Sequence, residues 1–409
     1  MFFLFYLLWC NAAVLMLLDR AYLYLAIPAG VQALLLASFY YLGFGLGEGV
    51  IVYYLPVLIA SAVLMLGHRH LLSVLAGASS LSLTAADRWV CLSFSWLIVL
   101  FGALDLLVNG VKILNPGTYA EFHGYGRYFR HFSIMCWVLI PVSLLCSRSR
   151  AVKLFFITYA LIFPVIIVDR NRLLLSFFAF FFCYVIYCNG WKRRNLNVIV
   201  LLVVVLAFGG LGAYRSGASF EVETSGKFLA DGFLPLRDSF FLLPSLLRQI
   251  VLYVTTPIVN YSLVYSVDFS NADFFLSQMS PFGREEYDAY PYSPVLVQRF
   301  NVGTEFFPQL MYGGVFFSSF SFVFMIVCFV FSVLFLRSSK SIFALVIFLK
   351  FAHTIIFMGF APQFFIFYNF AFVFLFLLLQ FFSRTLTALA RLNAINRSIP
   401  IGCDRTRVR

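Results

Sequence analysis

The chain has 409 residues, of which 62% are hydrophobic and 11% are charged, and its formal net charge is +12. A soluble domain is about 45–50% apolar and about 25% charged. A soluble core could not bury this many apolar side chains, which include 53 Phe. The composition therefore excludes an ordinary soluble globular protein and predicts that lipid surrounds most of the chain. Nucleic-acid binding is a poor explanation of the charge, because the basic residues are scattered among short loops.

Hydropathy predicts about eleven apolar segments that could cross a hydrocarbon core of about 30 Å as helices. The stretch 71–86 is short and rich in Ser and Ala, so a loop or an interfacial helix is expected there. The predicted fold class is an all-α polytopic membrane protein with about 11–12 transmembrane helices. The expected spans cover residues 2–18, 21–44, 49–66, 89–108, 131–146, 152–168, 173–190, 196–213, 311–336, 341–360 and 363–383.

The positions of Lys and Arg predict how these spans are oriented. Most of the 29 basic residues fall on one side of the predicted bundle, in the tail after Phe382 and in the loops at 68–70, 147–153, 191–194 and 337–340. Because cytoplasmic loops carry an excess of Lys and Arg, this side is predicted to be the cytoplasm, with the N-terminus outside. The run from Met1 has no basic segment before it, so we interpret it as a retained span rather than a cleaved signal peptide.

Four regions follow from this layout. An N-terminal bundle of about eight spans and a C-terminal set of three spans flank a large outer, periplasmic loop. Inside that loop, 239–265 is apolar but is interrupted by two prolines and by Arg248, so one or two helices are expected to lie in the outer interface or to re-enter the bundle. The basic cytoplasmic tail is expected to be flexible. The N-terminal bundle covers 1–213, the outer loop 214–310, the C-terminal spans 311–383 and the tail 384–409.

The eight cysteines do not predict a disulfide framework or a metal site. None of them lies in the long outer loop, and no CxxC spacing occurs. They are expected to be small buried hydrophobic residues. Motifs for nucleotide binding, zinc hydrolysis or a serine nucleophile are also missing from the sequence, so neither a metal nor a cofactor is predicted.

Arginine is common on the predicted outer side, where topology normally disfavours basic residues. A guanidinium group presents a fixed fork of donors that suits phosphate oxygens, so these residues predict a lipid-linked pyrophosphate as ligand. The alternative is local pairing with Glu121, Asp169, Glu221, Asp238 or the pair Glu285 and Glu286. The outer arginines are Arg127, Arg130, Arg170, Arg172, Arg215, Arg237, Arg248, Arg284 and Arg299.

The turn Asp169-Arg170-Asn171-Arg172 joins the sixth and seventh predicted spans with almost no loop. Two helix ends should therefore hold both arginines at the outer membrane surface. Arg172 lies near the N-terminus of the seventh span, where the helix dipole favours an anion. Asp169 is expected to orient one of the arginines. The alternative is a polar turn with snorkelling side chains.

The stretch RFNVGTEFFPQLMYGGVFF places Glu305 about six residues before the ninth span begins. Its carboxylate could act as a general base, hold a sugar hydroxyl or neutralise Arg299. The glycines at 303, 313 and 314 permit tight turns or close backbone approach.

Histidines and one lysine are further candidates. His123 and His131 flank the outer loop 109–130 and could act as bases, although His123 could equally be a polar loop residue. Lys350 and His353 lie inside the tenth span, where ionisable residues are energetically costly. They are expected either to line a polar cavity or to snorkel.

Three stretches occur in an order that resembles a known family. DRNRLLLSF (169–177) opens a middle span, YVTTPIVNYS (253–262) lies in the long outer loop, and GTEFFPQLMYGGVFF (303–317) enters a late span. The oligosaccharide repeat unit polymerases, which are the Wzy-type O-antigen and capsule polymerases of bacteria, show a similar order. The resemblance covers 165–317 in detail and the whole chain in layout.

The resemblance implies a glycosyltransferase of the bacterial cell inner membrane. Such an enzyme polymerises undecaprenyl-pyrophosphate-linked oligosaccharide repeat units into O-antigen, capsule or exopolysaccharide at the outer face of that membrane. The energy resides in the glycosyl–pyrophosphate bond, so no nucleotide is needed. The expected partners are the lipid-linked glycan, membrane lipid and a chain-length regulator.

On this hypothesis Arg170 and Arg172 bind the pyrophosphate together with Arg215, Arg248 or Arg299, which stabilises the leaving group electrostatically. Glu305 is the first candidate for activating the acceptor hydroxyl, and Asp169 or His123 is the second.

Other functions stay open. An O-antigen ligase acts on the same kind of lipid-linked glycan, but it usually depends on a histidine in the large outer loop, and 214–310 contains none. A flippase or secondary transporter would be expected to show repeated halves and charges inside the spans. A non-catalytic partner of a synthase is a third alternative.

Overall fold

The computed structural model describes residues 80–187 except 119, 120, 122 and 124, as well as 242–280, 304–359 and 364–398. Parts of 32–56 and 206–214 and residue 240 are also described. Helices are the only regular secondary structure in these ranges. Four described helices are long and apolar enough to cross a membrane, namely Ala85–Leu114, Tyr128–Leu145, Phe307–Ser339 and Phe367–Leu392. The chain is therefore a helical membrane protein, as the composition predicts.

The first group of helices begins with α5 (Ala85–Asn109), which covers the predicted span 89–108. Thr84 and Asp87 form a capping box that satisfies backbone donors at its start. The expected span 131–146 is not one regular α-helix, because it divides into α6 (Gly126–Ser133), the 3₁₀ helix η4 (Ile134–Val138) and α7 (Leu139–Leu145). Pro141 lacks the N–H that would bond to the carbonyl four residues earlier, which accounts for the irregular turn before it.

The helices α8 (Arg150–Ile166) and α9 (Arg170–Tyr187) overlap the expected spans 152–168 and 173–190, although neither is among the four described helices that are long and apolar enough to cross a membrane. They pack on each other, and both also contact η4. Between α5 and α6, the loop contains two short 3₁₀ helices, η2 (Lys112–Leu114) and η3 (Pro116–Thr118).

The second group contains α14 (Phe307–Ser339), α15 (Ile342–Phe357) and α16 (Phe367–Ser398), which overlap the last three expected spans. Of these, α14 and α16 are long and apolar enough to cross a membrane, and α15 is a shorter apolar helix. Gly314 has φ 66°, a left-handed conformation that favours glycine, and together with Gly313 it forms a kink in α14, inside the expected span 311–336. The sequence predicts a flexible tail from 384, but α16 continues as a helix to Ser398. The residues there are mostly good helix formers, and no Gly or Pro intervenes before Pro400.

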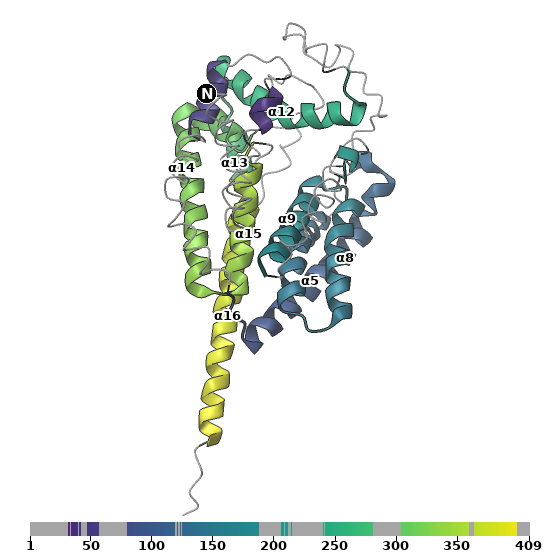
Figure 1. Cartoon of the computed structure of the whole chain (residues 1–409), viewed down its shortest axis with the longest axis vertical. Coiled ribbons are helices and arrows are strands. Elements are labelled where there is room, and N and C mark those ends of the chain that lie inside the picture. Colours follow the sequence, from purple (N-terminus) through teal and green to yellow (C-terminus); the bar gives the residue numbers. More distant parts are fainter. Residues whose placement is uncertain are drawn as a thin grey trace, which may run out of the picture.

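Two further helices come from the predicted large loop, α12 (Ser245–Ser266) and α13 (Ala272–Met279). Figure 1 shows α12 lying crosswise to α14 and α16 at one end of the molecule. The sequence predicts one or two helices in 239–265 that lie in the outer interface or re-enter the bundle, and α12 is the described helix of this stretch. Both helices pack against α14.

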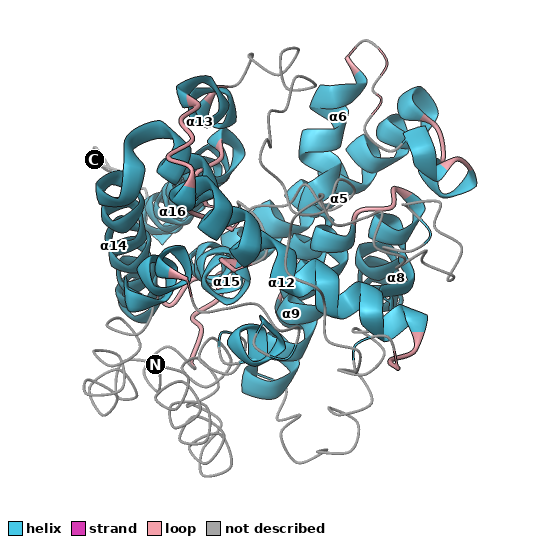
Figure 2. Cartoon of the chain, turned by 90° about the horizontal axis from the view of Figure 1, so that it is seen from above, coloured by secondary structure: helices cyan, strands magenta, loops and turns pink. Residues whose placement is uncertain are grey.

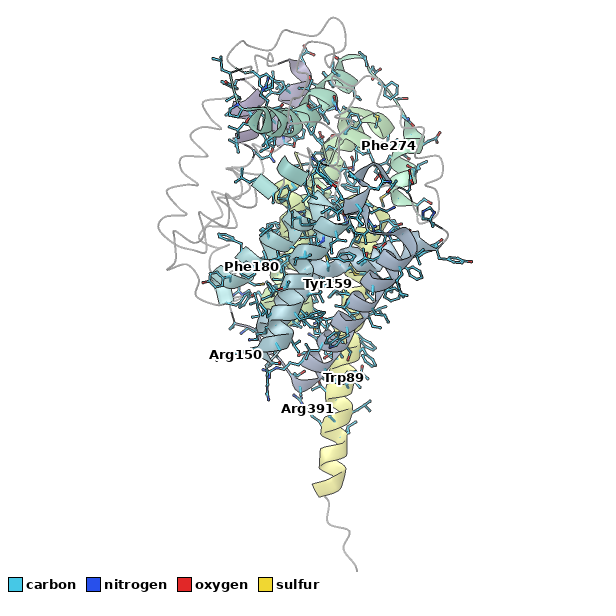
Figure 3. All side chains as sticks on the ribbon, turned by 90° about the vertical axis from the view of Figure 1, so that its right-hand side faces the viewer. Trp89, Arg150, Tyr159, Phe180, Phe274 and Arg391 are labelled. Carbon is cyan, nitrogen blue, oxygen red and sulfur yellow. The ribbon has the colours of Figure 1, made fainter. Side chains whose placement is uncertain are left out.

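The described chain thus has two distinct ends. At one end the Ser82 amide donates to the Lys340 carbonyl (2.8 Å) and the Ser383 hydroxyl donates to Asp87 (2.6 Å). Arg150 and Arg391 lie toward this end, whereas Phe274 of α13 lies toward the opposite one (Figure 3). The loops that the sequence assigns to the cytoplasm at 337–340 and before α5 therefore meet at one end. The other end, with α12 and α13, is called the α12 end below.

The core that positions the site is centred on α15. Residues 342–349 of this helix are each at most 3% exposed. Contacts join α15 to α14, to α16 and to α9. Viewed from above, α15 lies between the group of α13, α14 and α16 and the group of α5, α8 and α9 (Figure 2). A polar side chain on α15 is consequently enclosed by protein.

Candidate functional site

The polar turn at 169–172 is built by helix capping. Asp169 precedes α9, and its carboxylate accepts a hydrogen bond from the Arg172 amide (3.0 Å). An acid at this position satisfies an amide that has no partner within the helix and also complements the helix dipole. Val168 has φ 57°, so the chain reverses between α8 and α9 within three residues. The tight turn that the sequence predicts is therefore present.

Arg172 extends from this turn with limited local pairing. Its Nε lies 3.8 Å from an Asp169 carboxylate oxygen, a distance that allows an ion pair but not a hydrogen bond. This nitrogen has no hydrogen-bond partner among the described residues. Asp169 thus lies beside one arginine, as expected, but leaves donors of that arginine available. Arg170 is partly exposed in the same turn.

Two ionisable side chains of α15 face the same region. Lys350 is 5% exposed and His353 is 1% exposed. The charges of Arg172 and Asp169 are close enough to act on Lys350, and that of Arg172 also acts on His353. Neither ring nitrogen of His353 has a hydrogen-bond partner among the described residues. We call Arg172, Lys350 and His353 the basic cluster.

Glu305 lies next to the basic cluster and holds the connection between α15 and α16. Its fully buried carboxylate accepts from the Phe364 amide at both oxygens (2.9 and 3.0 Å) and from the Phe365 amide at one (3.1 Å). The Glu305 amide donates to the Met358 carbonyl (2.7 Å). Its charge also acts on Lys350. The carboxylate therefore has a clear positioning role in which backbone amides occupy both oxygens.

Neutral polar side chains surround Glu305 on another side. The carboxylate is close enough for its charge to act on the hydroxyl of Tyr53. A Cβ at Gly359 would lie 3.3 Å from this hydroxyl and 3.4 Å from the Gln32 amide nitrogen, so these two groups are near each other. Thr304 precedes Glu305 in the chain, and Gln309 follows it four residues later. We call Gln32, Tyr53, Thr304 and Gln309 the neutral polar cluster.

Aromatic rings and α12 complete this environment. The ring of Tyr53 lies 5.4 Å from that of Tyr261 and 6.4 Å from that of Phe306. Tyr261 shares a hydrogen bond of 3.0 Å with Ser318 of α14, and burial raises the pKa of Tyr261 to about 12, so its hydroxyl is neutral. The stretch 253–262 also places Thr255, Thr256 and Asn260 on the buried side of α12.

Arg130 has a structural partner that the sequence analysis did not identify. Its Nε lies 2.6 Å from Asp105, which is fully buried in α5. The same carboxylate accepts from Ser133 (2.6 Å) and Asn109 (2.7 Å). Arg130 is thus paired within the protein, but with an acid that is not among the partners expected from the sequence. Asp105 lies inside an apolar span, where acids are usually paired, so the sequence could have indicated this ion pair.

The other predicted residues do not join the basic cluster through any described contact. His123 is exposed in its loop, where its backbone amide donates to Asn109 (3.1 Å). His131 contacts Tyr368 of α16. Arg248 is half-buried in α12. Arg215, Arg237, Arg284 and Arg299 lie outside the described residues, as does the side chain of Arg127.

The site therefore combines two sets of side chains around one fixed carboxylate. No group of three or more His, Cys, Asp or Glu suited to a metal occurs among the described residues. The sequence pointed to Arg172, Asp169, Glu305, Lys350 and His353 separately, and the fold brings them together. It missed the neutral polar cluster, although Gln32 within an apolar run was a usable signal.

Comparison with protein-family models, with curated proteins and with solved structures gave no significant match. The fold and the composition define a helical membrane protein. Its site contains a buried basic cluster at the α12 end.

Proposed function

We propose that this protein polymerises oligosaccharide repeat units that are linked to a polyprenyl pyrophosphate, at the outer face of a bacterial inner membrane. The observation that carries the proposal is the basic cluster between α9 and α15. A lipid-linked pyrophosphate places an anion at the membrane surface and a long apolar chain in the bilayer, which suits a cationic site at one end of a bundle of apolar helices. The order of stretches that resembles the repeat unit polymerases also supports it.

The donors of the basic cluster that no described residue uses favour an anionic ligand here. Arg172 carries a positive charge in a largely buried setting, and a nearby anion would keep the buried amine of Lys350 protonated. Of the two nearby acids, Asp169 caps α9 and Glu305 accepts from backbone amides. Buried cations are unfavourable unless they are paired. A pyrophosphate would complete the pairing, and the same cations would stabilise its negative charge when the glycosyl bond breaks.

The sugar hydroxyl that receives the glycan must lose a proton during transfer. The geometry favours His353 as the general base that takes this proton. Its two ring nitrogens have no hydrogen-bond partner among the described residues, and an imidazole is suited to general base catalysis. Glu305 is assigned a positioning role because its oxygens already bind amides. His123 is less suitable because it is exposed in a separate loop.

The experiment is complementation of a host strain from which the chain has been deleted, with surface glycan separated on a gel. We expect the double variant Arg172→Gln, Lys350→Met to shorten the ladder or abolish it, with single repeats still attached to the acceptor. Arg150→Gln is the matched control, because Arg150 is exposed at the opposite end. Membrane levels of each variant are measured in parallel.

Other outcomes would overturn the proposal. A double variant that gives ladders of normal length and amount would exclude the pyrophosphate assignment. If the deletion leaves full-length polymer on the lipid carrier, the protein is a ligase. If single repeats accumulate on the cytoplasmic face, it is a flippase.

A further inference from the structure

The neutral polar cluster has hydrogen-bonding groups that the described protein does not use. The amide oxygen and nitrogen of Gln32 and Gln309, and the hydroxyls of Tyr53 and Thr304, have no partner among the described residues. Each of these side chains is at most 3% exposed. Buried polar groups in folded proteins are nearly always hydrogen-bonded. Gln32 and Tyr53 lie close to each other, and Tyr53 lies close to Glu305. Thr304 and Gln309 come from the stretch around Glu305. These unused groups therefore indicate a ligand rather than a packing defect.

The chemistry of the cluster indicates which ligand. Amides and hydroxyls can each donate and accept, and the four side chains carry no charge. The rings of Tyr261 and Phe306 lie near the ring of Tyr53, which belongs to the cluster. A sugar ring presents the matching surface, since its hydroxyls donate and accept while its C–H face packs on aromatic rings. An anion is less suitable, because none of the four side chains is cationic.

We propose that Gln32, Tyr53, Thr304 and Gln309 form a saccharide-binding subsite beside Glu305. It rests on the proposed function only for the identity of its natural ligand, a sugar of the lipid-linked repeat. Glu305 is close enough to act electrostatically on Lys350 of the basic cluster and on Tyr53 of the neutral polar cluster, so the two clusters are neighbours. The subsite is thus adjacent to the pyrophosphate site and would hold a sugar next to the bond that is exchanged.

The test uses the full chain in lipid nanodiscs. Binding of methyl glycosides of glucose, galactose, mannose, rhamnose, N-acetylglucosamine and N-acetylgalactosamine is followed by saturation-transfer NMR. We expect at least one glycoside to bind, and we expect Tyr53→Phe and Gln309→Met each to weaken its binding by about ten-fold, the effect of one lost hydrogen bond. These variants remove polar atoms that have no partner in the described protein, so their melting temperatures should not fall.

Two matched controls carry the same chemical changes elsewhere. The Tyr159 hydroxyl and the Gln380 side-chain oxygen are also buried without a described partner, but they belong to α8 and to the middle of α16. Tyr159→Phe and Gln380→Met should leave glycoside binding unchanged. A lower affinity in these controls equal to that in the cluster variants would overturn the proposal.

The other possible results of the binding test also decide whether the proposed subsite exists. If no glycoside in the panel transfers saturation to the wild-type protein, or if the cluster variants bind as the wild type does, the cluster holds water only and the proposal fails. The result of the glycoside test does not depend on the proposed function, because the glycosides carry no phosphate. Glycoside binding that depends on Tyr53 would stand even if the Arg172 and Lys350 variants produced normal ladders.

Discussion

The hydrogen bonds of Glu305 predict a large effect of its replacement on stability. In Glu305→Leu the amides of Phe364 and Phe365 lose their acceptor while they stay buried. An unsatisfied buried donor costs about 1–3 kcal/mol, so two of them should lower the free energy of unfolding by about 2–6 kcal/mol. Glu305→Gln retains one acceptor oxygen and should lose about half as much.

Two measurements on the purified protein check this prediction. Thermal unfolding followed by tryptophan fluorescence should rank the wild type above Glu305→Gln and the latter above Glu305→Leu. Hydrogen exchange should show faster exchange in 364–369 of both variants, because the carboxylate accepts from the Phe364 and Phe365 amides at the start of this segment. Gln380→Leu, which removes a buried polar side chain from the middle of α16, serves as a control and should not change exchange in this segment.

One result would refute this reasoning. If Glu305→Leu matched the wild type in melting temperature and in exchange, yet lost polymer formation, the carboxylate would act on the substrate rather than on the connection. The positioning role would then be wrong, and Glu305 would return as the general base.

Three further replacements test the packing. Asp105→Asn removes the charge that pairs with Arg130 and should lower the free energy of unfolding by about 3–5 kcal/mol, as measured by urea unfolding in detergent. A loss of stability smaller than that caused by replacing an exposed acid would contradict the pairing. Gly49→Ala would place a Cβ 2.7 Å from the Ser262 Cα and should lower the melting temperature. Gly210→Ala meets no atom of the described residues within 4 Å and should leave the melting temperature unchanged. Asp169→Ala should lose about 1 kcal/mol of cap energy, while Asp169→Asn should retain most of it, as compared by the same unfolding assay.

The sequence predicted the site in parts. The reversal at 169–172 could be predicted because a cap and a chain reversal depend on neighbouring residues. Lys350 and His353 could be noticed because charged groups are rare in apolar spans. Their meeting with Arg172 could not be predicted, since it requires that α9 pack on α15. The role of Glu305 was also hidden, because its partners, the Phe364 and Phe365 amides, lie far along the chain.

By itself the sequence determined that this is a helical membrane protein and where most described helices lie. That follows because a backbone in lipid must satisfy its own hydrogen bonds, so an apolar run of sufficient length forms a helix whatever its neighbours are. Only the tertiary structure decided that Arg130 pairs with Asp105 and that Tyr53, with Gln32 next to it, lies near Glu305. Helix association in lipid depends on close packing and interhelical hydrogen bonds, which hydropathy does not record.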